Sequence, residues 1–594
     1  MKPKPPDSIP APDSTTIRFL SIILVAFLTI ISASAAPDAE TVARQLSAAE
    51  KWVVTQVTAG EIADLDWHFP DVKDRKLSAH FLKELLTGTM PGVEPRRNGV
   101  RIIGATVAEP IALRNELIPF EVWLNHCQFT SRANFLRASF AATISFEDST
   151  FAAGASFYGI KVGNSAIFQN AVFEGSVDFG SADFATDFVA DKAQFKNKVE
   201  STSFNGMKVR GSAFFHKAVF EGTVDFILAD IAGNFEANEA QFTNKEQSVD
   251  FHSMKVGKIA FFKKAVFEGP VEFVSADIAA NFQAEEAQFR SKTYTVWLAM
   301  KCGGQGNFTG ASFAGPASFA DSTFLDLMIG GMKSGAASVP ELDLSRSSIK
   351  RQLRIRQISI HDLLAPSLHV EGPAELTDIT VKHSADLRYG NFATLDLSRS
   401  IWPKDTNREA FHMQGMSYKY VRAAPNEPES HEALLKLASE ASYTADVYRN
   451  LEEFFSRQGY REDADRAFIA GKCRERKEYL HGRNWLGSWL LDKLVGYGRH
   501  PSQAGYLCVF FVGLGCFLFS SQKMELQEPA NAPRIYNSFW YSLGLFLPFV
   551  DLQVAKVWKP KRDQTFLRNY MGVHILLGWI LIPIVLAALT GFIK

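Results

Sequence analysis

The chain has almost no net charge and few cysteines, and each of these absences excludes a class of protein. Its 594 residues include 63 basic and 64 acidic side chains, which give a formal net charge of -1. A dedicated nucleic-acid binder or an acidic mimic of DNA needs a strong field of one sign, so we expect no nucleic-acid partner. The five cysteines are scattered, odd in number and form no C-x-x-C pair, so we expect neither a disulfide framework nor a zinc site.

The signatures of catalysis are missing as well. No G-x-S-x-G, H-E-x-x-H, P-loop or dinucleotide-binding motif occurs in the context that its chemistry requires. The 13 histidines do not cluster at metal-binding spacing, and His216 and His252 fall at repeat positions where solvent-facing polar residues are expected. We therefore expect a protein that is not an enzyme, with no catalytic residue, no cofactor and no metal site.

Phenylalanine, in contrast, is heavily used, with 49 residues against 14 tyrosines and 10 tryptophans. A core-forming role explains this bias better than binding does, because binding surfaces favour tyrosine and tryptophan. From Phe129 to Phe157, phenylalanine recurs at alternating spacings of 6 and 5 residues. A longer period of 47 residues separates Ala-Val-Phe-Glu-Gly at 171–175, 218–222 and 265–269. The chain is therefore built on an internal repeat.

The alternating spacing excludes the two simplest structures. In a straight β-strand a spacing of five would place successive phenylalanines on opposite faces. In an α-helix the two phenylalanines of each eleven residues would lie far apart around the axis, and each glycine in the run would cost about 1 kcal/mol relative to alanine. If the chain turns a corner between successive phenylalanines, all of them can point inward. The pattern therefore predicts a β-helix with a phenylalanine core.

Small residues precede many of these phenylalanines by two places. Examples are Ala-Ser-Phe at 138–140, Ser-Thr-Phe at 149–151 and Ala-Val-Phe at 171–173. The units resemble the pentapeptide-repeat family, in its Phe-centred variant, whose unit is roughly F-x-x-A-x-F. The resemblance implies a right-handed quadrilateral β-helix with stacked phenylalanines inside, and four sides of this spacing give about 22 residues per turn. The expected core ladder comprises Phe129, Phe135, Phe140, Phe146, Phe151, Phe157, Phe168, Phe173, Phe179, Phe184, Phe220, Phe226, Phe267 and Phe273.

The repeat also sets the domain boundaries within a mainly β fold. We predict the Phe-centred β-helix over 99–330 and an irregular continuation over 331–421, where leucine and isoleucine replace phenylalanine. Helical patterning predicts an N-terminal cap over 36–98, which would cover the open end of the repeat. A C-terminal helical hairpin with an interfacial helix is predicted over 429–500.

Both ends of the chain carry apolar segments that indicate a membrane. Arg18 precedes the apolar stretch Phe19–Ile31 and an Ala-Ser-Ala sequence, which together predict a signal peptide over 1–35. The signal predicts that the large domain is exported.

The C-terminal region 505–594 is predicted to be a membrane module. Its apolar runs at 505–521 and 571–593 are expected to span the bilayer, and the shorter run at 537–550 fits a re-entrant or interfacial helix. Basic residues concentrate between the two long runs, so the positive-inside rule places that segment in the cytoplasm. We therefore predict a protein of the bacterial inner membrane with its large domain in the periplasm.

Acidic residues recur in the repeat and raise two interpretations. A solvated face beside lysines is one, and a cation-binding stripe along the β-helix is the other. The residues concerned are Glu174, Glu221, Glu268, Asp178, Asp225 and Glu272.

The C-terminal module also resembles membrane-anchored bacterial pentapeptide-repeat proteins through Leu-Pro-x-x-Asp-Leu at 547–552 and the pair Gly578-Trp579. That resemblance implies no particular activity. We expect a non-catalytic protein whose β-helix is a scaffold or binding surface for an extended protein or envelope polymer, with the lipid bilayer as a further partner. The alternative is a channel-like or transport-associated membrane protein regulated by the repeat domain. A channel would require a homo-oligomer, because two spans cannot enclose a pore.

Overall fold

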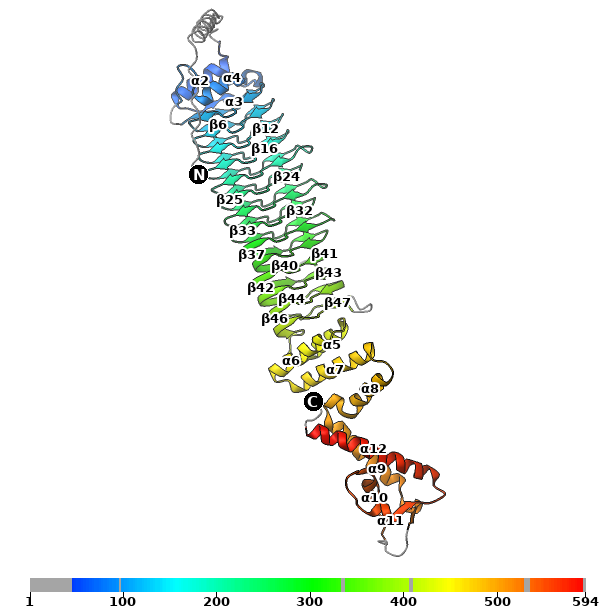
Figure 1. Ribbon diagram of the computed structural model, residues 1–594. Helices are drawn as coiled ribbons and strands as arrows, with labels where there is room; N and C mark the ends of the chain where they lie inside the picture. The colour runs from blue at the N-terminus through cyan, green and yellow to red at the C-terminus, as the bar shows by residue number, and fades with distance from the viewer. Residues whose placement is uncertain (1–44, 96–97, 333–336, 405–409, 528–534, 591–594) are drawn as a thin grey trace, which may run out of the picture.

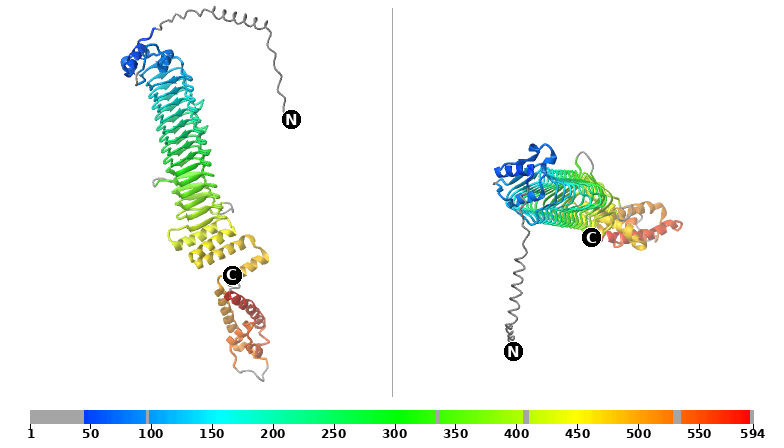
Figure 2. Two further views of the ribbon diagram at one scale, coloured as in Figure 1. Left: turned by 60° about the vertical axis from the view of Figure 1, so that its left-hand side comes forward. Right: turned by 90° about the horizontal axis from the view of Figure 1, so that it is seen from above.

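Most of the chain winds into one long parallel β-solenoid (Figure 1). The structure is a computed structural model, and it describes residues 45–95, 98–332, 337–404, 410–527 and 535–590. Small helices cover the N-terminal end of the rod, and the C-terminal helices follow its other end (Figure 2). The predicted signal peptide lies outside the described residues.

Each regular turn of the solenoid contains four strands of two residues. One such turn consists of β9 (Ser139–Phe140), β10 (Ile144–Ser145), β11 (Thr150–Phe151) and β12 (Ala155–Ser156). Each strand pairs in parallel with its counterpart in the next turn, so that Phe151 pairs with position 173, twenty-two residues later. One sheet takes a single strand from each turn and has 14 strands, which gives fourteen turns. At about 4.8 Å between strands the rod is roughly 65 Å long.

The corners of the turn explain the alternating spacing of phenylalanine. Phe135 and Phe140 are five residues apart, and Arg137 between them has a left-handed backbone with φ 55°. Asp148 and Asn170 occupy equivalent corners with φ 58° and 56°. For residues other than glycine this conformation costs about 1–2 kcal/mol, which the packing inside the corner must offset. One tight corner every eleven residues keeps both flanking rings pointing inward.

Stacked phenylalanine rings fill the interior. Each of the fourteen predicted core phenylalanines is at most 1% exposed. Phe129, Phe151 and Phe173 stack along the rod with ring centroids 4.8 and 5.0 Å apart and nearly parallel planes. Phe157 meets Phe151 edge-on at 6.0 Å and 83°. Stacked and edge-to-face contacts are the arrangements that the ring quadrupole favours. The predicted parallel β-solenoid with a stacked phenylalanine core is thus confirmed.

The 47-residue period corresponds to two unequal turns of the solenoid. Phe173 pairs with Phe195, 22 residues later, and Phe195 pairs with Phe220, 25 residues later. The longer turn carries a loop between β19 (Gln194–Phe195) and β20 (Thr202–Ser203). There the Asn197 side chain accepts hydrogen bonds from the backbone N–H groups of the second and third residues that follow it. A loop of this kind therefore projects from every second turn in the copied blocks.

Beyond Phe324 the core changes to leucine and isoleucine and the strands lengthen. β40 (Thr323–Gly330), β42 (Ser348–Arg356) and β44 (His369–Thr377) each extend past a corner and form two sides of a turn. The solenoid ends at β48 (Ser417–Arg422).

Helices α2 (Ala48–Ala59), α3 (Leu65–His68) and α4 (Ala79–Thr87) lie at the N-terminal end of the rod. β1 (Ala63–Asp64) pairs in parallel with β2 (Val100–Ile103), so the first turn does not present a bare edge. An exposed edge would invite pairing with other chains, and the cap prevents it.

Helices α5 (Glu427–Glu440), α6 (Ala445–Gln458) and α7 (Arg461–Tyr479) follow the last turn. α6 ends at Gly459, whose left-handed backbone (φ 88°) permits the reversal into α7. The next helix, α8 (Gly482–Val495), occupies the region of the predicted interfacial helix.

The C-terminal module packs α10 (Ser538–Phe546) against α9 (Pro501–Leu518) and α12 (Thr565–Leu589). Among the described residues, α12 is the single helix that by itself is long and apolar enough to cross a membrane, over Thr565–Ala587. α9 meets the same test only when it is joined to α8, and the two helices are bent by 113°.

Candidate functional site

A groove of about 580 Å³ runs along one corner of the solenoid in its C-terminal third. Its lining combines apolar residues with the charged and imidazole side chains of Glu341, His361, Asp362 and Lys382.

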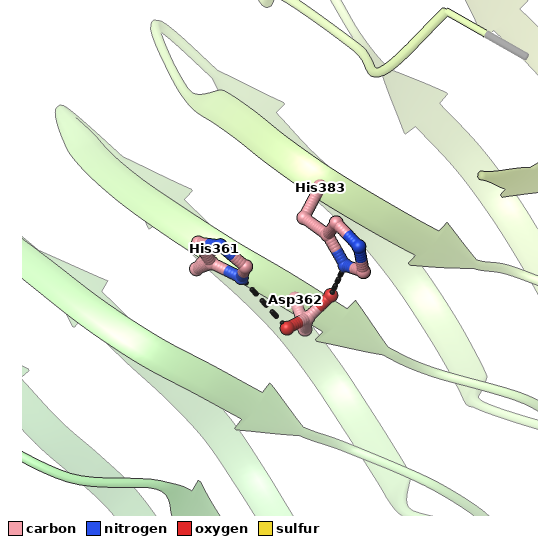
Figure 3. A group of neighbouring side chains, drawn as sticks. All are labelled: His361, Asp362 and His383. Atoms are coloured by element: carbon pink, nitrogen blue, oxygen red, sulfur yellow. Dashed lines mark hydrogen bonds and ion pairs between the residues drawn. The ribbon is translucent and has the colours of Figure 1, made fainter. Parts of the chain in front are cut away.

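His361, Asp362 and His383 form a compact cluster at this groove (Figure 3). The Nδ1 atoms of the two histidines lie 2.7 Å from different carboxylate oxygens of Asp362. The imidazole rings lie side by side, with centroids 5.0 Å apart and planes 22° apart. Both histidine side chains are more than half exposed, whereas that of Asp362 is only 25% exposed. One partly buried carboxylate therefore holds two accessible imidazoles.

An irregularity in strand pairing brings these side chains together. β43 (Ile358–Leu364) and β45 (Thr380–Asp386) pair in parallel. Val381 is the partner of Ile360, but Ser384 is the partner of Asp362, so β45 contains one extra residue at this corner. A bulge of this kind redirects a side chain and is over-represented beside functional sites. Here the bulge includes His383 and places it beside Asp362.

The electrostatics of the cluster keep Asp362 ionised. Burial raises the pKa of its carboxyl, but hydrogen bonds from Ser384 and from both histidines outweigh this effect and lower the pKa to about 2. Glu341 lies opposite Asp362 on the neighbouring strand. Its pKa is raised by burial and by the nearby carboxylates of Asp343 and Asp362. The corner therefore concentrates negative charge beside two histidines.

A second cluster of possible ligand atoms consists of Asp250, His252 and Glu272. Asp225, Asp250 and Glu272 follow one another on adjacent turns of one sheet. Burial and the Asp250 carboxylate raise the pKa of Asp225, and Glu272 accepts a 2.7 Å hydrogen bond from the Tyr294 hydroxyl. This part of the predicted acidic stripe forms a row, with a single histidine beside it.

Asp178 belongs to the same column, whereas Glu221 and Glu268 follow strands of another sheet. Glu221 pairs with Lys198 at 3.1 Å, and Glu268 pairs with Arg290. Cations thus neutralise Glu221 and Glu268, which fits the interpretation of a solvated face better than that of a cation-binding stripe.

His216 is held by carboxylates on both sides. Its Nδ1 lies 3.0 Å from Asp191 and its Nε2 lies 3.1 Å from Glu236, so both ring nitrogens are engaged. The hydrogen bond to Asp191 is the main cause that raises the pKa of His216 above its ordinary value, against the effect of burial. The arrangement is a structural ion pair on the solvent-facing side, as expected for this position.

The ion pairs of His216 give a testable pH dependence of stability. A histidine with a raised folded-state pKa stabilises the folded protein fully below 6.5, the ordinary pKa, and this contribution is lost as pH rises through the folded pKa. We expect His216→Gln to lower the free energy of unfolding by no more than about 1 kcal/mol at pH 5.5, because solvent screens the pair, and to have less effect at pH 8.5. Denaturant unfolding at both pH values measures the difference. Asp191→Asn should reproduce it, and an equal loss at both pH values would contradict the assignment.

The predicted core phenylalanines lie in the interior, out of reach of any partner. Two cysteines are equally inaccessible: burial raises the pKa of the Cys127 thiol to about 12 and that of Cys302 to about 11. The expectation that the histidines do not cluster is wrong at His361 and His383. These two residues are 22 positions apart, which is one turn of the rod. A search for histidines separated by one repeat turn would have found them.

Comparisons with protein-family models, with curated protein sequences and with solved structures find no match to this chain.

Proposed function

We propose that this chain is a non-catalytic, membrane-anchored pentapeptide-repeat protein whose β-helix is a scaffold or binding surface in the bacterial envelope. The observation that carries the proposal is a solid rod of fourteen turns joined through helices to an apolar helical module. Phenylalanine, leucine and isoleucine side chains fill the interior of the rod and leave its long outer faces for contact. Such faces suit extended partners, whereas small substrates favour concave pockets.

The family assignment is supported by the geometry of the turn. Four two-residue strands, inward-pointing phenylalanines and about 22 residues per turn agree with the right-handed quadrilateral β-helix of the pentapeptide-repeat family. The central residue of each unit is buried, and small residues such as Ala138 and Ala171 are buried beside it.

Membrane anchoring is supported by side chains that face outward from the C-terminal helices. Val509 and Phe517 on α9, and Val573 and Leu576 on α12, are each more than half exposed. In water such an apolar surface would be costly, whereas lipid accommodates it. We infer that α9 and α12 span the membrane, with the shorter α10 packed between them. Because basic residues concentrate between these two helices, we infer that this segment is cytoplasmic and that the rod lies in the periplasm.

Cysteine labelling of the whole chain in cells tests this topology. Buried Cys127 and Cys302 stay in place, and the partly exposed Cys473, Cys508 and Cys516 are replaced by serine. A cysteine introduced at the exposed Tyr158 should react with a membrane-impermeant maleimide once the outer membrane is permeabilised. A cysteine at the exposed Lys561, between the two spans, should react only after lysis. The reverse pattern would place the rod in the cytoplasm and refute the envelope proposal.

Co-sedimentation of the full chain in detergent with purified cell-wall sacculi tests the binding role. We expect the chain to sediment with the sacculi, or to capture a defined envelope protein that crosslinks to the rod. Absence of both interactions would count against the scaffold.

The packing of α10 between α9 and α12 favours a second candidate, a channel-like membrane protein regulated by the rod. Ser542 on α10 donates a 2.8 Å hydrogen bond to the Val512 carbonyl, and its oxygen lies 3.2 Å from His574 Nε2. Polar groups inside a membrane module can mark a transport pathway. Two spans cannot enclose a pore, so crosslinking in membranes that yields only monomers would exclude this candidate.

A further inference from the structure

We propose that His361, Asp362 and His383 bind one divalent transition-metal ion of the Zn²⁺ type at the corner groove of the solenoid. The proposal does not depend on the scaffold function or on the membrane topology. It rests on the arrangement of three ligand-bearing side chains from two adjacent strands.

The distances within the cluster suit a single ion. One nitrogen from each histidine and one oxygen from Asp362 all lie within 4.8 Å of one another. Two ligand atoms on one tetrahedral Zn²⁺ ion lie about 3.3 Å apart. Rotation of exposed imidazoles is enough to close this difference, because the backbone already places both rings beside the carboxylate (Figure 3).

The scaffold under the ligands is rigid. β43 and β45 are held in register on both sides of the bulge, and Ile360 and Leu363 anchor the corner in the buried core. Sites built on strands hold their ligands more precisely than sites on loops. Ser384 donates a hydrogen bond to Asp362 and fixes the orientation of the carboxylate, which is the usual task of an outer hydrogen-bond partner at a metal site.

The chemistry of the ligands selects the class of ion. Imidazole and carboxylate suit Zn²⁺, Co²⁺, Ni²⁺ and Cu²⁺, whereas Ca²⁺ and Mg²⁺ prefer sites made of oxygen alone. With the ion on the two Nδ1 atoms, each neutral imidazole would carry its proton on Nε2. Asp362 and Glu341, its partner on the neighbouring strand, bring carboxylates to the site, whereas Lys382 brings a positive charge to the same groove.

Three protein ligands leave the ion an open coordination position. A structural zinc site normally has four protein ligands, whereas an open site takes water or a group from a bound molecule. The site borders the groove described above, so a carboxylate or imidazole of a molecule in that groove could complete the coordination shell.

Metal titration of the full chain in detergent, purified without a histidine tag and treated with a chelator, tests the proposal. Co²⁺ is followed by its visible absorption and Zn²⁺ by competition with a chromophoric chelator. We expect the wild-type chain to bind one equivalent of Co²⁺ or Zn²⁺, which excess Ca²⁺ does not displace. His361→Ala and His383→Ala should each abolish this binding. Ser384→Ala should retain this equivalent with an affinity about 10–100-fold weaker.

Matched variants separate this site from other histidines. His369→Ala changes a partly exposed histidine on β44, in the same part of the rod, and His252→Ala alters the second cluster. Both should retain the equivalent, and unchanged circular dichroism of every variant establishes that it is folded. The proposal would be overturned if both His361→Ala and His383→Ala still bound one equivalent of metal ion. It would also be overturned if the wild-type chain bound neither Co²⁺ nor Zn²⁺ in the presence of a weak competing chelator.

Discussion

Phe157→Ala is expected to lower the free energy of unfolding of the solenoid by about 3–5 kcal/mol. The ring is fully buried and lies between the parallel rings of Phe135 and Phe179, at 4.9 and 4.8 Å. Phe146, Phe151 and Phe168 meet the ring edge-to-face at 5.8, 6.0 and 5.1 Å. Alanine would leave a cavity in a stack whose other members are fixed by their own turns. Urea unfolding in detergent, followed by circular dichroism, measures the loss.

The effect should also be local, because each turn of a solenoid contacts only its neighbours. Hydrogen exchange should quicken in β8 (Ala133–Asn134) and β16 (Val177–Asp178), which pair with β12, more than in β44 near the other end. Tyr158→Ala is the matched control, because Tyr158 directly follows Phe157 but is 38% exposed. Its removal should lower the free energy of unfolding by less than about 1 kcal/mol. Equal losses from the two variants would show that the phenylalanine stack does not carry the stability of the rod.

The regular part of the fold follows from a local rule, which is why the sequence predicts it. A ring every five or six residues can reach a shared interior only when the backbone turns between rings, and this requirement does not depend on distant parts of the chain. The left-handed residues at the tight corners were less predictable. Arg137 and Asp148 occupy positions that glycine would adopt at lower cost, so residue type alone does not mark the corner.

The 47-residue period was visible in the sequence, but its division into turns of 22 and 25 residues was not. The extra residues form a loop that has no hydrophobic periodicity, and only the pairing of Phe195 with Phe220 locates it. The long strands beyond Phe324 were equally hidden, because leucine and isoleucine suit strands and helices alike.

The candidate metal cluster shows a different limit of prediction from the sequence. His361 and Asp362 are neighbours in sequence, but His383 reaches them through the pairing of adjacent turns and a one-residue bulge. The spacing rules for metal sites on a helix or hairpin do not cover a solenoid, in which residues one turn apart lie about 5 Å apart. Once the 22-residue turn is known, the two histidines become a recognisable pair.

The packing of the C-terminal module could not be predicted from apolar runs, which give the length of a helix and not its neighbours. The structure places small residues where helices approach closely. A Cβ atom at Gly515 would lie 2.2 Å from Ser542 Oγ, and one at Gly578 would lie 1.8 Å from the carbonyl oxygen of Phe546. Small residues at such crossings allow helices to pack by direct backbone contact.

Gly578→Val is therefore expected to separate α10 from α12 and to destabilise the C-terminal module by about 3 kcal/mol. The added side chain would meet the backbone of α10 at Phe546, which cannot move aside as a flexible side chain could. Separation of the helices would also break the hydrogen bonding between His574 Nε2 and the Ser542 carbonyl oxygen, which lie 3.1 Å apart. Thermal unfolding in detergent should show a lower melting temperature for the C-terminal helices.

Gly572→Val provides the matched control, because it makes the same change in the same helix where a Cβ atom would have nothing within 4 Å. Both variants lose the same glycine flexibility and add the same isopropyl side chain, so the changes in helix propensity and in hydrophobicity cancel in the comparison. Only the contact with α10 differs. A melting temperature that falls equally in both variants would mean that α10 does not pack on α12 at Gly578, and the hydrogen bonds of His574 and Ser542 would then need another explanation than helix packing.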